Sequence, residues 1–213
     1  MRKLLESVDR AKFNANTFEL SNGLTVIHQY LPATPVVVTD VWVEAGAIAE
    51  PESWSGMAHF LEHMIFKGSP NVMVGEFDWL IENTGGVANA ATSYDYAHFY
   101  LTTAAPHLEK TLPALADILL RASIPDEEFI REREVVIEEI GSYNDDPDFL
   151  GFQALCQNAY QHHPYRRSIL GEKEQLLTYP QSNALFSSHP LSARKYDGGD
   201  YWRYRTRTCF GFG

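Results

Sequence analysis

Two histidines and a glutamate stand one helical turn apart in the motif HFLEH, as His59, Glu62 and His63. The run around them has no proline and no glycine before Gly68, which predicts a helix that ends near Lys67. On a helix, side chains at positions i, i+3 and i+4 share one face. Two imidazoles on that face can bind a metal ion, and the carboxylate beside them can act as a base. The same residues also fit an ordinary helical turn, so the metal interpretation requires a third ligand.

A strongly acidic stretch further along the chain can supply this ligand. Residues 125–146 predict a helix that carries six glutamates, most of which must face solvent. Glu132 and Glu139 lie two turns apart, on one stripe beside the apolar residues 135–136. Because apolar contacts draw this side of the helix inward, a carboxylate there needs a partner. A metal ion held by the two histidines is a suitable partner.

The elements that must position these two helices follow from the periodicity of the remaining sequence. Strands are predicted in a hairpin at residues 18–31, in a β-branched run at 35–45 of the kind found in buried strands, and in two runs within 87–104. Further helices are predicted at residues 74–82 and 106–122. The sequence therefore predicts an α/β (α+β) fold, with an antiparallel-rich mixed sheet packed by helices on one side.

The run at residues 87–93 (VANAATS) has unusually small side chains for a strand, and two interpretations of it stay open. Small side chains leave the backbone N–H and C=O groups approachable, which suits pairing with an extended peptide. The same composition also suits a tightly packed inner strand. The sequence favours neither interpretation.

Composition limits the classes of function. The chain has 213 residues, 45% of them hydrophobic, which is enough for one large domain with a buried core. Its net charge of −11 argues against nucleic acid or an anionic membrane surface as a partner and is otherwise that of a well-solvated surface. Two cysteines are too few for a disulfide framework. Because the sequence shows no apolar leader and no long apolar window, the expected location is the cytoplasm.

The two helices together resemble a known group of peptidases. The motif HFLEHMIFKG, followed at the usual distance by EREVVIEEI, is similar to the inverzincins, the M16 family of pitrilysin, insulin-degrading enzyme and mitochondrial processing peptidase. The resemblance covers about residues 15–183. It extends to NGL at 22–24, GVANAATS at 86–93, YNDDP at 143–147 and HPY at 163–165.

This resemblance implies a zinc metalloendopeptidase that cuts unfolded or short polypeptides. His59, His63 and Glu139 would bind one zinc ion per chain and leave a fourth position for water. Glu62 would be the general base that takes a proton from this water. Glu138 is the rival for the third ligand, although it lies about 100° away from the stripe of Glu139.

The family pattern also assigns residues around the metal. Glu132 would orient a ligating histidine, and Asn89 and Ala90 would hold the polypeptide substrate by backbone pairing. Residues 1–183 are expected to form an incomplete N-terminal M16-type domain, whose partner would be a second M16-type domain or subunit. The alternative is an inactive, truncated or partner-subunit domain that binds only zinc or peptide.

The last stretch departs from the family pattern. From Phe186 the hydrophobic periodicity is lost, and the extended segment and apolar strand of the family are missing. Codons permitted for Phe186–Gly213, translated one base later, can restore that pattern. Residues 184–213 are therefore expected to be a divergent tail that is frameshifted or disordered.

Overall fold

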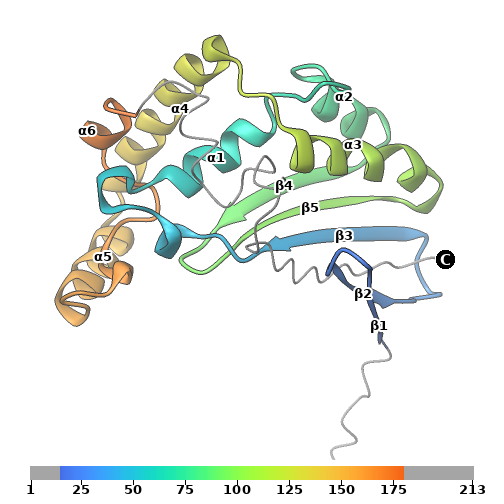
Figure 1. Cartoon of the computed structure of the whole chain (residues 1–213), viewed down its shortest axis with the longest axis horizontal. Helices are drawn as coiled ribbons and strands as arrows, with labels where there is room; N and C mark the ends of the chain where they lie inside the picture. Colours follow the sequence, from blue (N-terminus) through green and yellow to red (C-terminus); the bar gives the residue numbers. More distant parts are fainter. Residues whose placement is uncertain (1–14, 180–213) are drawn as a thin grey trace, which may run out of the picture.

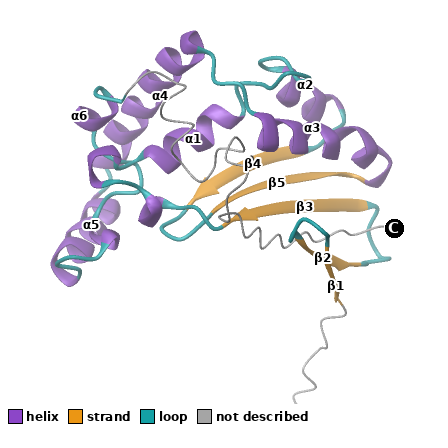
Figure 2. Cartoon of the chain, viewed as in Figure 1, coloured by secondary structure: helices purple, strands orange, loops and turns teal. Residues whose placement is uncertain are grey.

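A three-stranded antiparallel sheet in the order β3–β5–β4 carries the helices on one of its faces (Figure 1). The computed structural model describes residues 15–179. Within this range the sheet consists of β3 (Val36–Val43), β4 (Val87–Thr92) and β5 (Ala97–Ala104), and β1 (Ala15–Glu19) pairs with β2 (Thr25–Gln29) in a separate hairpin. Figure 2 shows helices and strands as distinct layers. The prediction of an α/β fold with antiparallel sheets is confirmed.

Six α-helices occur in the described residues: α1 (Met57–Ile65), α2 (Glu76–Asn83), α3 (Leu108–Arg121), α4 (Asp126–Asn144), α5 (Pro147–Ala159) and α6 (Lys173–Leu176). The first four correspond to the predicted helices, with small shifts at their ends. Helix α5 was not predicted, because Pro147 follows the predicted helix at 125–146 and fits the end of that helix. Proline also fits the first position of a helix, and the Asp146 side chain caps α5 by accepting a hydrogen bond from Asp148 N (2.9 Å).

Burial in the sheet alternates along its strands. In β5, the side chains of Phe99 and Leu101 are buried under the helices, whereas the intervening residues are half-buried on the opposite face. The same alternation holds in β3, where Val37 is buried but Val36 and Val38 are 38% and 40% exposed. The prediction of a buried strand at 35–45 is therefore wrong for one face of β3. The described helices cover only the other face.

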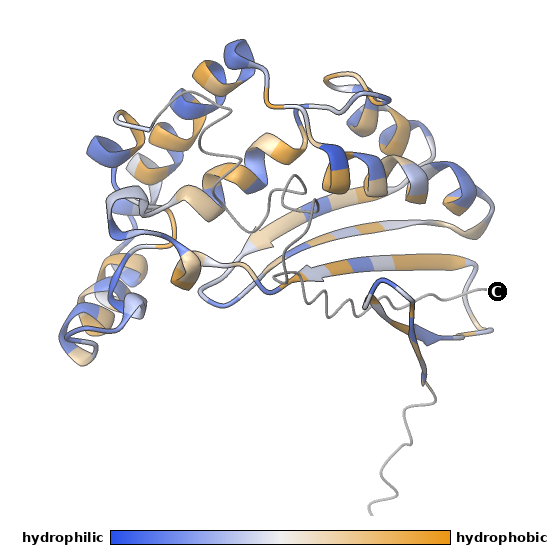
Figure 3. Ribbon diagram, in the orientation of Figure 1, coloured by the Kyte–Doolittle hydropathy of each residue, from blue (hydrophilic) through white to orange (hydrophobic). Residues whose placement is uncertain are grey.

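Helix α1 lies in the middle of the core and contacts both β4 and α4. Its apolar side chains are almost completely buried, including Phe60, Leu61 and Met64. Figure 3 shows that α4, which packs against it, alternates between hydrophobic and hydrophilic segments along its length. This packing leaves one polar side of α1 facing α4 and β4, and that side carries the HFLEH motif.

Two predictions concern parts of the chain outside residues 15–179. The domain boundary at residue 183 and the divergent tail at 184–213 both lie beyond the described residues, so both stay predictions. Among the described helices, none is both long enough and apolar enough to cross a membrane.

Candidate metal centre

Helices α1 and α4 bring two imidazoles and one carboxylate together. The Oε2 atom of Glu139 lies 3.6 Å from His59 Nε2 and 3.4 Å from His63 Nε2. One donor atom from each of the three side chains lies within 4.8 Å of the other two. Two imidazole nitrogens and one carboxylate oxygen at this separation can hold a zinc ion and leave one coordination position open.

Glu132 links this cluster to a lysine. Its Oε1 atom lies 2.9 Å from Nδ1 of His63, and its Oε2 atom lies 2.6 Å from Nζ of Lys67. Burial alone would raise the pKa of Glu132, but the hydrogen bonds from His63 and Lys67 outweigh it and hold the pKa below its usual range. An ionised Glu132 accepts the Nδ1 proton of His63, which directs Nε2 toward the metal position.

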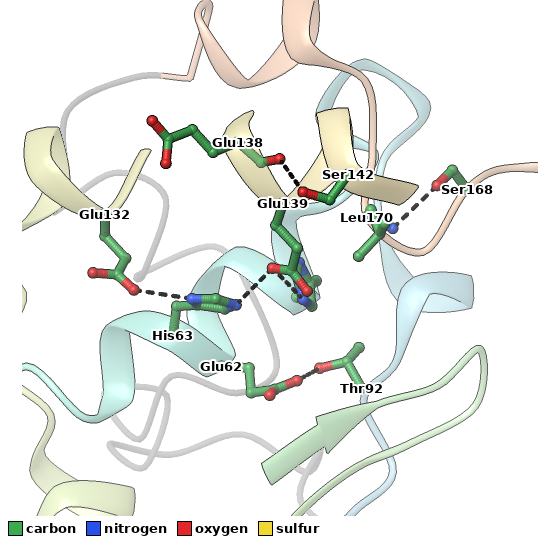
Figure 4. A network of polar contacts seen from close by, with 10 residues as sticks. Glu62, His63, Thr92, Glu132, Glu138, Glu139, Ser142, Ser168 and Leu170 are labelled. Atoms are coloured by element: carbon green, nitrogen blue, oxygen red, sulfur yellow. Dashed lines mark hydrogen bonds and ion pairs between the residues drawn. The ribbon is translucent and has the colours of Figure 1, made fainter. Parts of the chain in front are cut away.

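The rival ligand Glu138 does not join the cluster. Its side chain is exposed, and Figure 4 shows its carboxylate pointing away from the His63 ring. The contact drawn for Glu138 is made by its main-chain oxygen, which accepts a hydrogen bond from Ser142 Oγ (3.2 Å). Of the two neighbouring acids, only Glu139 points at the histidines.

The protonation of the two histidines differs. Burial lowers the pKa of His59 to about 4, and the neighbouring His63 adds to this shift, so His59 is neutral at physiological pH, as a metal ligand must be. Burial acts on His63 in the same direction, but hydrogen bonds with Glu132 and Glu139 outweigh it and raise its pKa to about 9. The carboxylates that hold this proton also favour a divalent cation in its place.

The start of α1 is fixed by a buried acid in the loop that precedes the helix. Glu50 is 6% exposed, and its two carboxylate oxygens accept hydrogen bonds from Gly56 N (2.9 Å) and Ala58 N (2.7 Å). Gly56 has a φ of 92°, and a Cβ atom there would lie 2.6 Å from the main-chain oxygen of Leu170, so only glycine fits. Burial raises the pKa of Glu50 to about 7, although both N–H groups and Arg167 oppose the shift. Glu50 thus acts as a remote cap for the helix that carries both histidines.

Glu62 faces β4 from the same helix. Its Oε2 atom accepts a short hydrogen bond from Thr92 Oγ1, as Figure 4 shows. Burial raises the pKa of Glu62, and the hydrogen bond from Thr92 opposes this. Glu62 and the three candidate ligands line a cleft of about 710 Å³, which is also bordered by residues 88–92 of β4 and by the apolar Phe66, Phe149 and Leu170.

Strand β4 presents a free edge to this cleft. The hydrogen bond from Ser93 N to Tyr96 O (2.7 Å) sets the alternation of the β4–β5 ladder, in which every second residue of β4 bonds to β5. The main-chain groups of Ala88, Ala90 and Thr92 therefore point to the free edge. Because β4 lies at the edge of the sheet within the described residues, residues 87–93 are not an inner strand of that sheet, and their pairing with an extended peptide stays a prediction. Asn89 bonds to β5 through its main chain, while its Oδ1 atom accepts the N–H of Ala90 (2.9 Å).

Sequence reasoning missed three of these side chains. The contribution of Lys67 could have been predicted, because it lies four residues after His63 and so on the same helical face. The contributions of Glu50 and Thr92 could not. Their contacts depend on how the 46–56 loop and β4 pack against α1, and neither spacing nor periodicity reveals this.

Comparison with known proteins identifies the family of the chain. Residues 25–173 match the family described as Insulinase (Peptidase family M16). The chain belongs to this family.

The M16 relatives and solved structures cover most of the described residues. The chain is 34% identical over 160 residues to the mitochondrial-processing peptidase subunit beta of Neurospora crassa, covering 75% of this chain and 34% of that protein. It is 36% identical over 154 residues to the zinc protease PqqE of Helicobacter pylori, covering 71% of this chain and 35% of that protein. The crystal structure of a protease from Helicobacter pylori superposes with a TM-score of 0.77 at 31% identity, over 84% of this chain and 44% of that one.

These M16 comparisons establish a peptidase-family domain whose relatives include proteins named as zinc proteases. The chain spans about a third of the length of the curated relatives it matches. A solved structure described as an inactive M16 domain, from Pseudomonas fluorescens, has the same fold, with a TM-score of 0.73 at 18% identity over 81% of this chain and 42% of that one. Membership of the M16 family therefore does not by itself imply catalysis.

Proposed function

We propose that this M16 domain is the zinc-binding catalytic part of a metalloendopeptidase. The observation that carries the proposal is the convergence of His59, His63 and Glu139 within 4.8 Å, with Glu62 on the same face of α1. Two nitrogen donors and one oxygen donor with an open fourth position are the donor set of a catalytic zinc site. One zinc ion per chain is expected.

The proposed roles follow from the positions of the side chains. Bound zinc would lower the pKa of a water molecule and polarise the scissile carbonyl group. Glu62 would take the proton of this water and later return it to the leaving amine. The raised pKa of Glu62 favours both steps, because a base with a pKa closer to neutral can also act as an acid. Glu132 would accept a hydrogen bond from the protonated Nδ1 of His63 and thereby hold the orientation of the imidazole ring.

The substrate is proposed to be an extended polypeptide that adds a strand to the free edge of β4. Ala90 is the central residue of this edge, and its N–H is occupied by the Asn89 side chain, so an incoming peptide would take this N–H from Asn89. Backbone pairing of this kind requires an unfolded or short polypeptide. The apolar side chains of Phe66 and Phe149 at the cleft would favour an apolar substrate residue next to the cleaved bond.

A second M16-type domain or subunit is the proposed partner, because these M16 relatives are about twice as long as this chain. One relative is named a subunit of a processing peptidase. The alternative function is that of an M16 domain that binds zinc or peptide without cleaving it. The similarity in fold to a domain described as inactive is consistent with this alternative. The presence of Glu62 together with all three candidate ligands argues against it.

Cleavage of a quenched fluorescent peptide by the zinc-loaded chain tests the proposal. Glu62→Gln should bind zinc as the wild type does but lose cleavage by at least about 100-fold, the usual range of a general base. Glu138→Gln makes the same change in charge on an exposed side chain and should leave cleavage unaltered. Stoichiometric zinc without Glu62-dependent cleavage would refute the catalytic proposal and leave the binding alternative.

A further inference from the structure

Thr92, the last residue of β4, makes a side-chain contact with Glu62. We propose that Thr92 is a positioning residue, whose hydroxyl holds Oε2 of Glu62 so that Oε1 stays available for proton transfer. The inference rests on the proposed role of Glu62 as general base. Its basis is geometric and has three parts.

The first part is the hydrogen bond itself. A glutamate side chain has three rotatable torsions, so without a partner the Glu62 carboxylate would populate several rotamers in a cleft of this size. Thr92 Oγ1 donates to Oε2, and within the described residues this is the one hydrogen bond that Glu62 makes through its carboxylate. Thr92 is β-branched and therefore stiff at χ1, which makes it a rigid donor.

The second part is the fixed position of Thr92 relative to α1. The main-chain oxygens of the next two residues, Ser93 and Tyr94, accept hydrogen bonds from Ala47 N (3.1 Å) and Ile48 N (2.8 Å). The loop of residues 46–56, which carries these two donors, approaches the end of β4 closely. A Cβ atom on Gly46 would lie 2.3 Å from Ser93 O. The same loop continues directly to the acid that caps α1. The end of β4 and the start of α1 are thus held by one segment, and the hydroxyl of Thr92 bridges the two elements again at Glu62.

The third part is the main chain of Thr92. In the β4–β5 ladder its N–H and C=O point to the free edge, where the proposed peptide strand would pair. Thr92 therefore offers its main chain to the substrate and its side chain to the base. A peptide bound along the edge would be placed at a fixed distance from the Glu62 carboxylate, which is the condition for efficient proton transfer.

Thr92→Val and Thr92→Ser separate this role from simple packing. Valine keeps the shape of the residue but removes the hydroxyl, and serine keeps the hydroxyl. In zinc-loaded full chain we expect Thr92→Val to lower kcat about 10-fold or more, with KM, zinc content and melting temperature unchanged, and Thr92→Ser to restore kcat. Thr102→Val removes a hydroxyl from the opposite face of the sheet and serves as the matched control.

Crystal structures of the wild type and both variants provide a readout that needs no turnover. The Glu62 carboxylate should leave its position or spread over several rotamers in Thr92→Val and return in Thr92→Ser. An unmoved carboxylate in Thr92→Val overturns the inference whatever the activity, and so does a moved carboxylate with unchanged kcat. If the wild-type chain cleaves no peptide, the proposed function fails, and the crystal structures alone decide whether Thr92 positions Glu62.

Discussion

Glu132 offers a direct test of how the candidate metal centre is supported. The residue is 8% exposed, and its two oxygens are shared between His63 Nδ1 (2.9 Å) and Lys67 Nζ (2.6 Å). Glu132→Gln keeps the shape of the side chain but replaces one acceptor oxygen with an NH₂ group. Because both neighbours donate, glutamine can satisfy only one of them and must place a donor against the other.

Glu132→Gln is expected to weaken both the binding of zinc and the stability of the fold. Loss of a group that orients a metal-ligating histidine weakens metal binding about 10- to 100-fold. Since glutamine can still accept from His63, the lower end applies, about 10-fold or about 1.4 kcal/mol. The side chain of Lys67 is 24% exposed, so the loss of its ion pair should cost the zinc-free protein about 1–2 kcal/mol, less than a fully buried pair.

Zinc affinity is measured by competition with a chromophoric chelator at pH 7.5, and stability by urea denaturation of the zinc-free protein. Glu138→Gln is the control, because it removes the same charge from an exposed position on α4. If Glu132→Gln binds zinc as tightly as Glu138→Gln does, Glu132 does not orient His63, and the proposed support of the site is wrong.

Two further predictions concern the scaffold. The pKa of Glu50 in the folded protein, about 7, lies above its ordinary value of 4.5, so the folded protein binds more protons than the unfolded chain between these pH values. The contribution of Glu50 to stability is therefore greatest below pH 4.5 and is lost as the pH rises through 7. Relative to wild type, Glu50→Gln should therefore gain about 3 kcal/mol of unfolding free energy between pH 4.5 and pH 7.5 in urea titrations, and parallel pH profiles would contradict the assignment. Phe60→Ala should cost about 3–5 kcal/mol because Phe60 is fully buried against Phe129 of α4 and Tyr179, whereas Phe152→Ala, at a 51% exposed residue, should change stability by less than about 1 kcal/mol.

The sequence was sufficient to predict those parts of the site that depend on the spacing of residues within a single helix. The spacing of His59, Glu62 and His63 fixes their common face, and the seven-residue separation of Glu132 and Glu139 fixes another. Both faces exist in the structure and meet each other. The local pattern of α4 pointed to Glu132 and Glu139 together, and the resemblance to the M16 family was needed to assign Glu139 as the expected ligand and Glu132 as the residue that orients a histidine.

Features that depend on how loops and separate elements pack against one another could not be predicted in this way. Glu50 reaches the start of α1 across a loop, and Thr92 reaches Glu62 from another layer of the fold. The exposed face of β3 was missed because β-branched residues suit both half-buried and buried strands. Helix α5 was missed because proline marks the beginning of a helix as readily as the end of one.

We propose that His59, His63 and Glu139 bind one zinc ion. X-ray absorption at the zinc edge of the loaded chain tests this most directly. We predict two imidazole nitrogens and two oxygen neighbours at about 2.0–2.2 Å, with loss of one oxygen neighbour and weaker binding in Glu139→Gln but not in Glu138→Gln. A coordination shell without imidazole, or one unchanged by Glu139→Gln, would contradict the account.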